Sequence, residues 1–377
     1  MNREPQPVTI VAHDVGGVGG MERQLAELIA GLCRRGHPVT VIAWKCELEP
    51  GVEADVHLVG GPRRPFPFGY LSFMVLGSLA LRRRRRGVVQ ATGAIVLNPV
   101  DVLAIHCCHQ VYRAAPRRAG ALYRVYETAV GLMKRFGERA IVERNRRAAI
   151  VCVSEGVADE MREHYPRAAG RVLAIHNGVD TDLFSPGGAR ERARGLRASN
   201  GIPAGRLVVS FVARGWGHKG LGELIEALAQ APAWDLFVAG SGDEQTYRAL
   251  ADRVGVAGRI HWLGVVGDVQ TVYAASDAFA MASSYETFSL VTFEAAATGL
   301  PVLATDVNGV RELVNDGTTG FIVRREAADI ARRLNELAGD AELRERVGAA
   351  AREAALAFSW ERMVDRHVAL YSALAAR

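Results

Sequence analysis

Short apolar segments that alternate with helix-forming segments run through this chain in two successive series. The first series has apolar runs at 8–13, 39–44, 55–59, 88–91, 102–105, 150–154 and 172–175. The second starts after residue 206, with runs at 207–213, 235–239, 260–263, 277–281, 301–304 and 320–323. Short apolar strands that alternate with helices are typical of parallel sheets covered on both faces. The sequence therefore predicts an α/β protein with two doubly wound, Rossmann-like domains.

The length of 377 residues agrees with two domains of roughly 100–200 residues each. The segment SPGG at 185–188 interrupts the pattern, so we predict an N-terminal domain over 1–184 and a second domain over 185–357. The final segment, 358–377, is predicted to be an amphipathic helix. Doubly wound domains bind ligands at the carboxyl ends of their strands, which places the expected ligand in a deep cleft between the two.

Several classes of protein are excluded by what the sequence lacks. No apolar run reaches the ~18–20 residues that span a bilayer, and residues 1–13 contain no secretory apolar region. The five cysteines form no CxxC pair, which favours reduced thiols in a cytoplasmic protein. A nicotinamide dehydrogenase is disfavoured, because GxGxxG is absent from the first series and, at 215–220, is not followed by an acid at the end of the next apolar run, 235–239.

Positive charge is concentrated in the first half of the chain. Residues 1–186 carry 25 Lys and Arg against 18 Asp and Glu, whereas residues 187–377 carry 21 against 23. This asymmetry favours an anionic partner for the first domain. Within 62–86 an apolar stretch precedes five arginines, which indicates either an interfacial helix on an anionic membrane or a buried helix with a solvated end. Other basic clusters lie at 113–118, 134–139 and 144–147. Nucleic acid is not expected as a partner, because aromatic and basic residues interleave only weakly.

One glycine-containing turn follows the first strand of each series. Residues 16–20 (GGVGG) would let backbone amides approach a phosphate, although a plain strand–helix turn fits as well. In the second turn, Arg214 and Lys219 can bracket a diphosphate, with the arginine as a planar fork and the lysine as a point charge. The alternative is two solvated surface cations. This is disfavoured for Lys219, because the chain is rich in arginine and contains only three lysines.

A pair of glutamates, Glu286 and Glu294, is separated by seven residues. Ser289 is positioned to cap a helix that ends near Gly299, so Glu286 precedes the helix and Glu294 lies inside it. Their offset of up to ~12 Å is too long for a carboxylate dyad but suits two ends of one extended ligand. The alternative is one loop carboxylate and one solvated helix carboxylate.

Together these motifs resemble the retaining GT-B glycosyltransferases of family 4 (glycosyltransferase group 1). The resemblance covers 19–43, HNGVDTDLF (176–184), ARGWGHKG (213–220), VAGSGDE (238–244), ETFSLVTFEAAATGLPVLATD (286–306) and NDGTTGFIV (315–323). It implies transfer of a hexose-type sugar from a nucleotide-diphosphate sugar to a hydroxyl of a cell-envelope lipid or saccharide. A UDP-sugar is preferred over a GDP-sugar as the donor. Lipopolysaccharide core, glycolipid and exopolysaccharide are the acceptors considered. It also implies that helix 358–377 returns to the first domain.

The resemblance assigns roles to individual residues. Gly19 and Gly20 would lie near the donor phosphates, and Arg214 and Lys219 would hold the diphosphate. Glu286 would contact the donor sugar and Glu294 the ribose, while the backbone of Phe288, Ser289 and Leu290 would donate to sugar and phosphate. The family has glycine where this chain has Thr287, so the local loop geometry is open. A histidine beside the transferred sugar is expected at His106, with His109 as the alternative.

Metal binding is not expected. The residues His106–His109 (HCCH) cannot easily bind one zinc ion, because neighbours on a strand point to opposite faces. Asp180-Thr181-Asp182 lies inside the HNGVDTDLF segment of the resemblance and is therefore interpreted as structural. No metal is then implied, because protein cations would neutralise the leaving diphosphate. We expect front-face attack by the acceptor hydroxyl on a short-lived oxocarbenium ion pair, with catalysis mainly electrostatic.

Three other functions remain open at this stage: a nucleotide-sugar epimerase, a phosphorylase, and a non-catalytic subunit that binds nucleotide sugar. The basic first domain disfavours the first two. The joint presence of Arg214, Lys219, Glu286 and Glu294 disfavours the third. The expected location is the cytoplasm, with peripheral contact of 62–86 at the inner face of the membrane.

Overall fold

A computed structural model describes residues 5–17, 19–112 and 121–376. Val18 of the glycine-rich turn and the basic cluster 113–118 lie outside the described residues. The chain forms two compact units, which we describe separately. Unit 1 contains Met1–Gly178 and Trp360–Arg377, and unit 2 contains Val179–Ser359.

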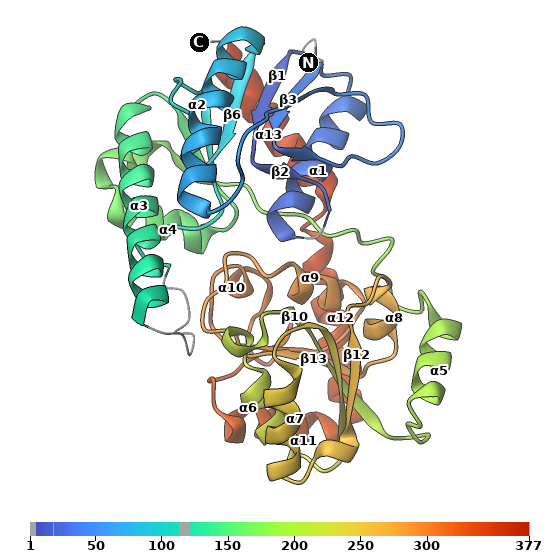
Figure 1. The fold of residues 1–377 in the computed structure, drawn as a ribbon. Coiled ribbons are helices and arrows are strands. Elements are labelled where there is room, and N and C mark those ends of the chain that lie inside the picture. The colour runs from blue at the N-terminus through green and yellow to red at the C-terminus, as the bar shows by residue number, and fades with distance from the viewer. Residues whose placement is uncertain (1–4, 18, 113–120, 377) are drawn as a thin grey trace. The chain divides into compact units, whose positions relative to one another are not determined.

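Unit 1 is built on a seven-stranded sheet with the order β5-β3-β1-β6-β7-β8-β9, all parallel (Figure 1). The strands are β1 (Val8–Val11), β3 (Val39–Ala43), β5 (Asp55–Leu58), β6 (Val88–Thr92), β7 (Val102–Ile105), β8 (Ala149–Cys152) and β9 (Val172–Ala174). A short pair, β2 (Asp14–Val15) and β4 (Lys45–Cys46), follows β1 and β3. The helices are α1 (Gly20–Arg34), α2 (Phe66–Arg84), α3 (Ala121–Arg144), α4 (Glu155–His164), the 3₁₀ helix η1 (Pro166–Arg171) and α13 (Trp360–Ala375).

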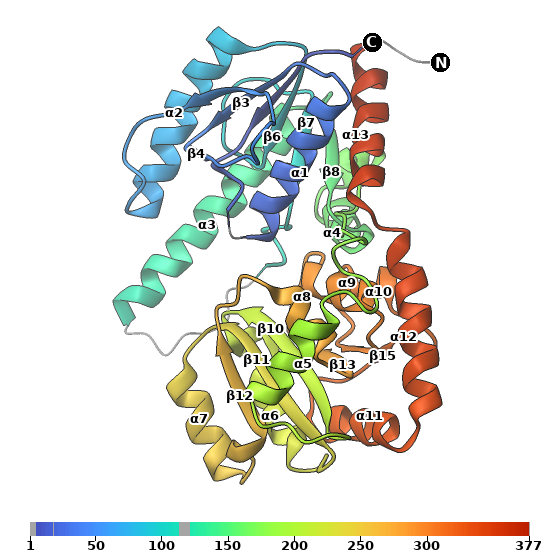
Figure 2. The same ribbon diagram turned by 90° about the vertical axis from the view of Figure 1, so that its right-hand side faces the viewer.

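Helix α13 is the segment that returns to unit 1 after unit 2 is complete. It packs on α1, and Figure 2 shows both helices on the face of the sheet opposite α2. A Cβ on Gly31 of α1 would lie 2.4 Å from Cγ2 of Val364, so only glycine permits this approach. Tyr371 Oη donates to Gln90 Oε1 at 2.7 Å, and both side chains are buried. The helix is therefore part of the core of unit 1.

Unit 2 is built on a six-stranded parallel sheet with the order β12-β11-β10-β13-β14-β15. The strands are β10 (Leu207–Arg214), β11 (Trp234–Ser241), β12 (Ile260–Gly264), β13 (Ala278–Met281), β14 (Val302–Ala304) and β15 (Phe321–Ile322). The helices are α5 (Arg190–Ser199), η2 (Trp216–Lys219), α6 (Leu221–Leu228), α7 (Glu244–Arg253), η3 (Ala257–Arg259), α8 (Val269–Ala274), α9 (Leu290–Ala297), α10 (Val310–Leu313), α11 (Ala327–Gly339) and α12 (Ala341–Leu356).

The two doubly wound domains predicted from the apolar runs are confirmed, but the units meet at 178/179, six residues before the predicted boundary. The residues between belong to unit 2 through specific contacts. Val179 N–H donates to Phe358 O at 2.8 Å, and the carbonyl of buried Phe184 accepts from Arg352 at 2.6 Å. The SPGG sequence is therefore a loop within unit 2.

Across the described ranges, no helix is both long and apolar enough to cross a membrane. All five cysteines are free thiols.

Candidate functional site

The candidate site in unit 2 lies where the strand order of its sheet reverses. The first strand, β10, is flanked by β11 on one side and β13 on the other, and doubly wound sheets bind ligands at such a point, beyond the carboxyl ends of the strands. Two loops leave the sheet there: η2 after β10, and residues 282–289 after β13. Ser284 N–H donates to His218 O at 2.8 Å, which joins the two loops.

An ion pair connects these loops through their charged side chains. Lys219 Nζ lies 2.5 Å from Glu286 Oε1, and Ser283 Oγ donates to the same oxygen at 2.7 Å. The side chains are 19% and 9% exposed, respectively. A partly buried carboxylate of this kind is stabilised by its cation and hydrogen bond. The sequence pointed to both residues but contained no signal for their pairing.

The η2 turn that carries Lys219 is held in a fixed conformation. Gly215 and Gly220 flank it with φ of 68° and 83°, values that favour glycine. A Cβ on Gly220 would lie 2.4 Å from Ala282 O. Trp216 is buried, and its Nε1 donates to Ala213 O at 3.0 Å. Arg214 is the last residue of β10, and its side chain is exposed.

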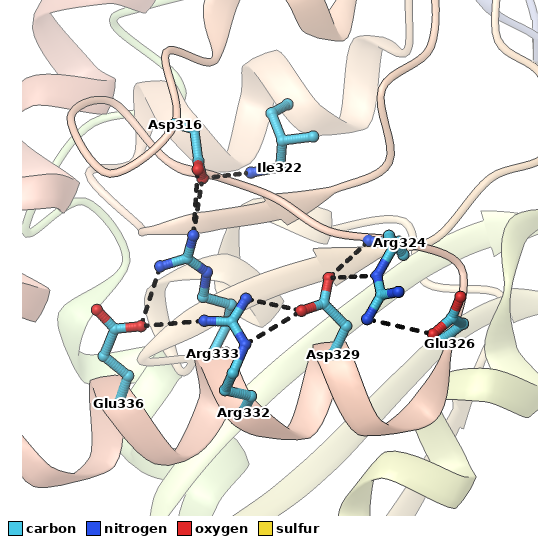
Figure 3. A network of polar contacts seen from close by, with 8 residues as sticks. All are labelled: Asp316, Ile322, Arg324, Glu326, Asp329, Arg332, Arg333 and Glu336. Carbon is cyan, nitrogen blue, oxygen red and sulfur yellow. Dashed lines mark hydrogen bonds and ion pairs between the residues drawn. The ribbon is translucent and has the colours of Figure 1, made fainter.

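Arg325 supports the same turn from the far edge of the sheet. Its Nη2 donates to Gly217 O at 2.6 Å, and its Nε lies 2.7 Å from Glu223 Oε1. The segment before Arg325 is fixed by two carboxylates, as Figure 3 shows: Asp316 accepts from Ile322 N–H and Asp329 from Arg324 N–H. Sequence reasoning missed Arg325, because a contact to a carbonyl 108 residues away leaves no local pattern.

Helix α9 places Glu294 in the interior. Tyr273 Oη donates to Glu294 Oε2 at 3.2 Å, and both side chains are buried. The alternative of a solvated helix carboxylate is therefore wrong for Glu294.

The start of α9 differs in detail from the prediction. The helix begins after Ser289 as predicted, but Ser289 has φ of 69° and its side chain makes no capping bond to the backbone. Capping requires extended backbone, which this residue lacks. Its Oγ instead forms a 2.8 Å hydrogen bond with Thr292 Oγ1. The left-handed residue of this loop is thus Ser289, two positions after Thr287.

Phe288 contributes backbone rather than side chain to this region. Its ring is buried and stacks on Phe293 with centroids 4.1 Å apart. A Cβ on Gly309 would lie 2.2 Å from Phe288 O, so the 306–310 loop packs closely on this backbone. The first amides of a helix lack partners one turn earlier in the helix, and at the start of α9 the Thr292 N–H donates to Ser289 O at 2.9 Å.

A hollow of about 450 Å³ lies beside this loop, at the carboxyl ends of β13, β14 and β15. Its lining contains Ser283, whose hydroxyl bonds Glu286. The remaining lining residues are Ser284, Thr305, Asp306, Val307, Ile322, Val323, Arg324 and Arg325.

In unit 1 the glycine-rich turn lies between β1 and α1. Gly16 has φ of 75°, and a Cβ there would lie 1.8 Å from Glu47 O, so this glycine packs against the strand pair β2–β4. Gly19 immediately precedes α1 and Gly20 is its first residue. Both therefore lie at a helix N-terminus, where backbone amides favour anions.

His106 follows β7 at the carboxyl edge of the same sheet. Its Nε2 is buried and has no hydrogen-bond partner among the described residues. Burial, with a smaller contribution from His367, lowers the pKa of His106 to about 4, so the imidazole is neutral at pH 7. A neutral imidazole with an unsatisfied nitrogen is suited to a hydroxyl group of a ligand.

His109 is held by protein groups instead. Its Nδ1 lies 3.5 Å from Cys107 Sγ, and its backbone N–H donates to Glu138 Oε2 at 2.9 Å. Glu138 also accepts from Tyr165 Oη at 2.8 Å. Burial raises the pKa of Glu138. This buried network fixes the loop that contains both histidines, and sequence reasoning did not detect Glu138.

The Asp180-Thr181-Asp182 motif, considered above as a metal site, is hydrogen-bonded to the backbone. Asp180 Oδ1 accepts from the backbone N–H of Asp182 and Leu183, at 3.1 and 2.8 Å, which makes it the centre of a turn. Within 5–17, 19–112 and 121–376, no three His, Cys, Asp or Glu side chains are grouped so that they could hold a metal ion.

Comparison of the chain with known proteins identifies its family. Residues 18–183 match the family described as Glycosyltransferase Family 4, and residues 194–354 match Glycosyl transferases group 1. The D-inositol 3-phosphate glycosyltransferase of Corynebacterium efficiens is 35% identical, over 95% of this chain and 91% of that protein. The chain belongs to this glycosyltransferase family. The Bacillus subtilis protein named putative glycosyltransferase EpsD is 32% identical, but the match covers 55% of this chain and 56% of that protein.

Solved structures agree on the fold of this glycosyltransferase. WaaG, a glycosyltransferase involved in lipopolysaccharide biosynthesis, has a TM-score of 0.79 at 21% identity, over 97% of this chain and 99% of that chain. Sucrose-phosphate synthase from Thermosynechococcus elongatus has a TM-score of 0.81 at 22% identity, over 98% and 99%. The Anabaena protein HepE, solved with UDP-glucose, has a TM-score of 0.75 at 21% identity, over 98% and 100%. The fold is GT-B.

Proposed function

We propose that this glycosyltransferase moves a hexose-type sugar, with retention of the anomeric configuration, from a UDP-sugar to a hydroxyl of a cell-envelope lipid or saccharide. The Lys219–Glu286 pair carries the proposal, because it presents a cation and a carboxylate at the binding edge of unit 2. A diphosphate requires the first charge, and sugar hydroxyls require an acceptor of the second kind. HepE, which shares the fold, was solved with UDP-glucose, and this supports UDP as the nucleotide.

On this proposal, different residues of unit 2 bind different parts of the donor. Lys219 and Arg214 bind the diphosphate, helped by the amides at the start of α9. Glu286 accepts hydrogen bonds from the donor sugar, and Glu294 accepts them from the ribose. In unit 1, Gly19 and Gly20 contact the phosphates, and His106 accepts or donates a hydrogen bond at the transferred sugar.

The proposed reaction breaks the bond between the anomeric carbon and the phosphate oxygen. Negative charge develops on the leaving diphosphate, where Lys219 and Arg214 stabilise it. The acceptor hydroxyl then attacks the anomeric carbon on the face that the diphosphate leaves, and its proton passes to the departing phosphate oxygen. Because Glu286 is bound to Lys219 and Ser283, we assign it to positioning the sugar rather than to nucleophilic attack. Lys219 and Arg214 supply the positive charge for which other enzymes use a metal ion. We also propose that the reaction takes place in the cytoplasm.

The test measures donor binding and transfer in one set of variants. Calorimetry with UDP, GDP and ADP should show selective UDP binding, which Lys219→Met weakens at least tenfold. Arg192→Met is the matched control, because it removes an exposed, ion-paired arginine of the same unit and should leave UDP binding unchanged.

Products from UDP-sugars and candidate acceptors are then analysed by NMR for the configuration at the anomeric carbon. Retention supports the proposal, whereas inversion contradicts it. Binding without transfer to any acceptor would indicate a non-catalytic subunit. Isomerisation of the sugar without an acceptor would indicate an epimerase.

A further inference from the structure

Helix α2 carries two apolar stripes, and only one of them packs on unit 1. The first stripe, with Tyr70, Phe73 and Leu81, is buried. The second, on the other side of the helix, consists of Phe68, Leu71, Val75, Leu76 and Leu79, all of them exposed. Their spacing of three, four, one and three residues keeps them on one face. A helix that is apolar all round is normally buried, so this outer face requires a partner.

Helix α3 adds further exposed apolar side chains next to the outer stripe of α2. The two helices lie side by side in both views, and Lys134 Nζ of α3 lies 4.9 Å from the ring of Phe66 in α2 (Figures 1 and 2). The exposed apolar residues of α3 lie on two sides of the helix, with Tyr123 and Tyr126 on one side and Val125, Leu132 and Phe136 on the other. Of the 17 large apolar side chains that are exposed among the described residues, ten therefore belong to these two helices. Phe68 and Phe136 are 67% and 70% exposed. Such concentration marks an interaction surface.

The charge beside this apolar surface has a single dominant sign. Arg82–Arg86 follow the outer stripe of α2 directly, and all five are exposed. Helix α2 contains no acidic residue. On α3, Arg124 is exposed as well, whereas the exposed Arg139 is paired with Glu143 at 3.0 Å. Arg85 is paired with Asp101, which leaves a strong local excess of positive charge.

We propose that the outer faces of α2 and α3, with Arg82–Arg86, form a surface that binds an anionic lipid bilayer. The apolar side chains enter the boundary between headgroups and acyl chains, as in interfacial helices. The arginines reach the lipid phosphates, and their aliphatic stems lie along the apolar region. Helix faces that combine exposed apolar side chains with an adjacent cluster of arginines suit the boundary and the anionic headgroups of a bilayer. The surface belongs to unit 1 alone, so the inference does not depend on the proposed donor site.

The first experiment measures binding of the full chain to vesicles. Co-sedimentation with vesicles of phosphatidylcholine alone should show little binding, and vesicles with 30% phosphatidylglycerol should bind the protein. Binding should weaken as NaCl is raised from 50 to 500 mM, because salt screens the surface charge. Equal binding to both vesicle types would overturn the proposal.

Two sets of variants test the two parts of the surface. Arg82→Gln/Arg83→Gln/Arg84→Gln should reduce partitioning by about a hundredfold, at about 1 kcal/mol per arginine. Phe68→Ser/Val75→Ser/Phe136→Ser should abolish binding while the thermal unfolding midpoint is unchanged, because the side chains are exposed. The control Leu183→Ser/Val265→Ser/Leu356→Ser changes three exposed apolar residues of unit 2 and should bind as the wild type.

Sedimentation velocity separates a bilayer from a second copy of the chain. The proposal expects the Phe68/Val75/Phe136 variant to have the same oligomeric state as the wild type. A dimer that disappears in this variant would assign the surface to contact between copies and overturn the proposal. Unchanged vesicle binding in either set of surface variants would overturn it too.

Discussion

The substitution Glu286→Gln tests the assignment of the ion pair most directly, because it should move two properties in opposite directions. Glutamine keeps the shape of Glu286 and an acceptor for Ser283, but it removes the negative charge 2.5 Å from Lys219 Nζ. In the wild type a diphosphate competes with Glu286 for Lys219. A hydrogen bond to a charged group contributes about 1.5–3 kcal/mol net, so removal of this competitor should tighten UDP binding about tenfold or more.

Sugar transfer should fall in the same variant. Loss of one pre-organised polar group in an active site lowers turnover by about 10²–10³. Lys219→Met should behave differently, because it weakens UDP binding and transfer together. The assay is calorimetry with UDP and a steady-state rate on the preferred UDP-sugar. If Glu286→Gln weakens UDP binding as much as Lys219→Met does, the two residues do not play the separate roles assigned to them.

The double variant measures the pair itself. Lys219→Met alone leaves the mostly buried carboxylate of Glu286 with Ser283, at a cost of about 1–3 kcal/mol in the free energy of unfolding. Adding Glu286→Gln should restore part of that loss, so urea unfolding should give a coupling energy above about 1 kcal/mol. A coupling near zero would contradict the observed contact.

Three further outcomes are expected. Gly220→Ala should weaken UDP binding at least tenfold in calorimetry, because its Cβ would lie 2.4 Å from Ala282 O and displace the turn that carries Lys219; wild-type affinity would contradict this. Arg325→Met should weaken UDP binding severalfold through the lost bond to Gly217 O, whereas the neighbouring Arg324→Met should not, and equal effects would point to general charge. The free energy of unfolding in urea should fall as the pH drops from 6.5 to 4. Over that range the unfolded chain takes up protons that the folded chain excludes, so each group contributes at most about 1.4 kcal/mol per pH unit, and a flat profile would refute it. The groups responsible are four histidines of unit 1 whose pKa burial lowers to about 4: His13, His106, His109 and His367.

The fold was predictable because burial leaves a pattern in the sequence. The run 102–105 is β7 to the residue, since a strand buried on both faces is apolar throughout. The predicted helix stop at Gly299 is confirmed by its φ of 85°. The predicted domain boundary differs by six residues from the observed division, because a loop with Pro and Gly resembles a linker wherever it lies. Only the contacts of Val179 and Phe184 show that the chain before it already belongs to unit 2.

The candidate site was predictable as a set of residues but not as a network. Arg214, Lys219, Glu286 and Glu294 stand out through spacing and resemblance. The bonds from Lys219 to Glu286 and from Tyr273 to Glu294 join segments 67 and 21 residues apart, and no local periodicity records such contacts. Supporting residues such as Arg325 and Glu138 are ordinary charged residues in the sequence, and only the tertiary structure gives them a role.

The return of α13 to unit 1 fixes an order of events during synthesis. Unit 2 is one continuous segment, 179–359, and all of its contacts are available once that segment leaves the ribosome. Unit 1 is translated first, yet it must wait for residues 360–376 before Val364 can cover Gly31 and Tyr371 can reach Gln90. A nascent chain from which residue 359, but not α13, has left the ribosome would therefore hold a complete second domain and an incomplete first one. On such an intermediate the face of α1 that α13 covers would be exposed to solvent.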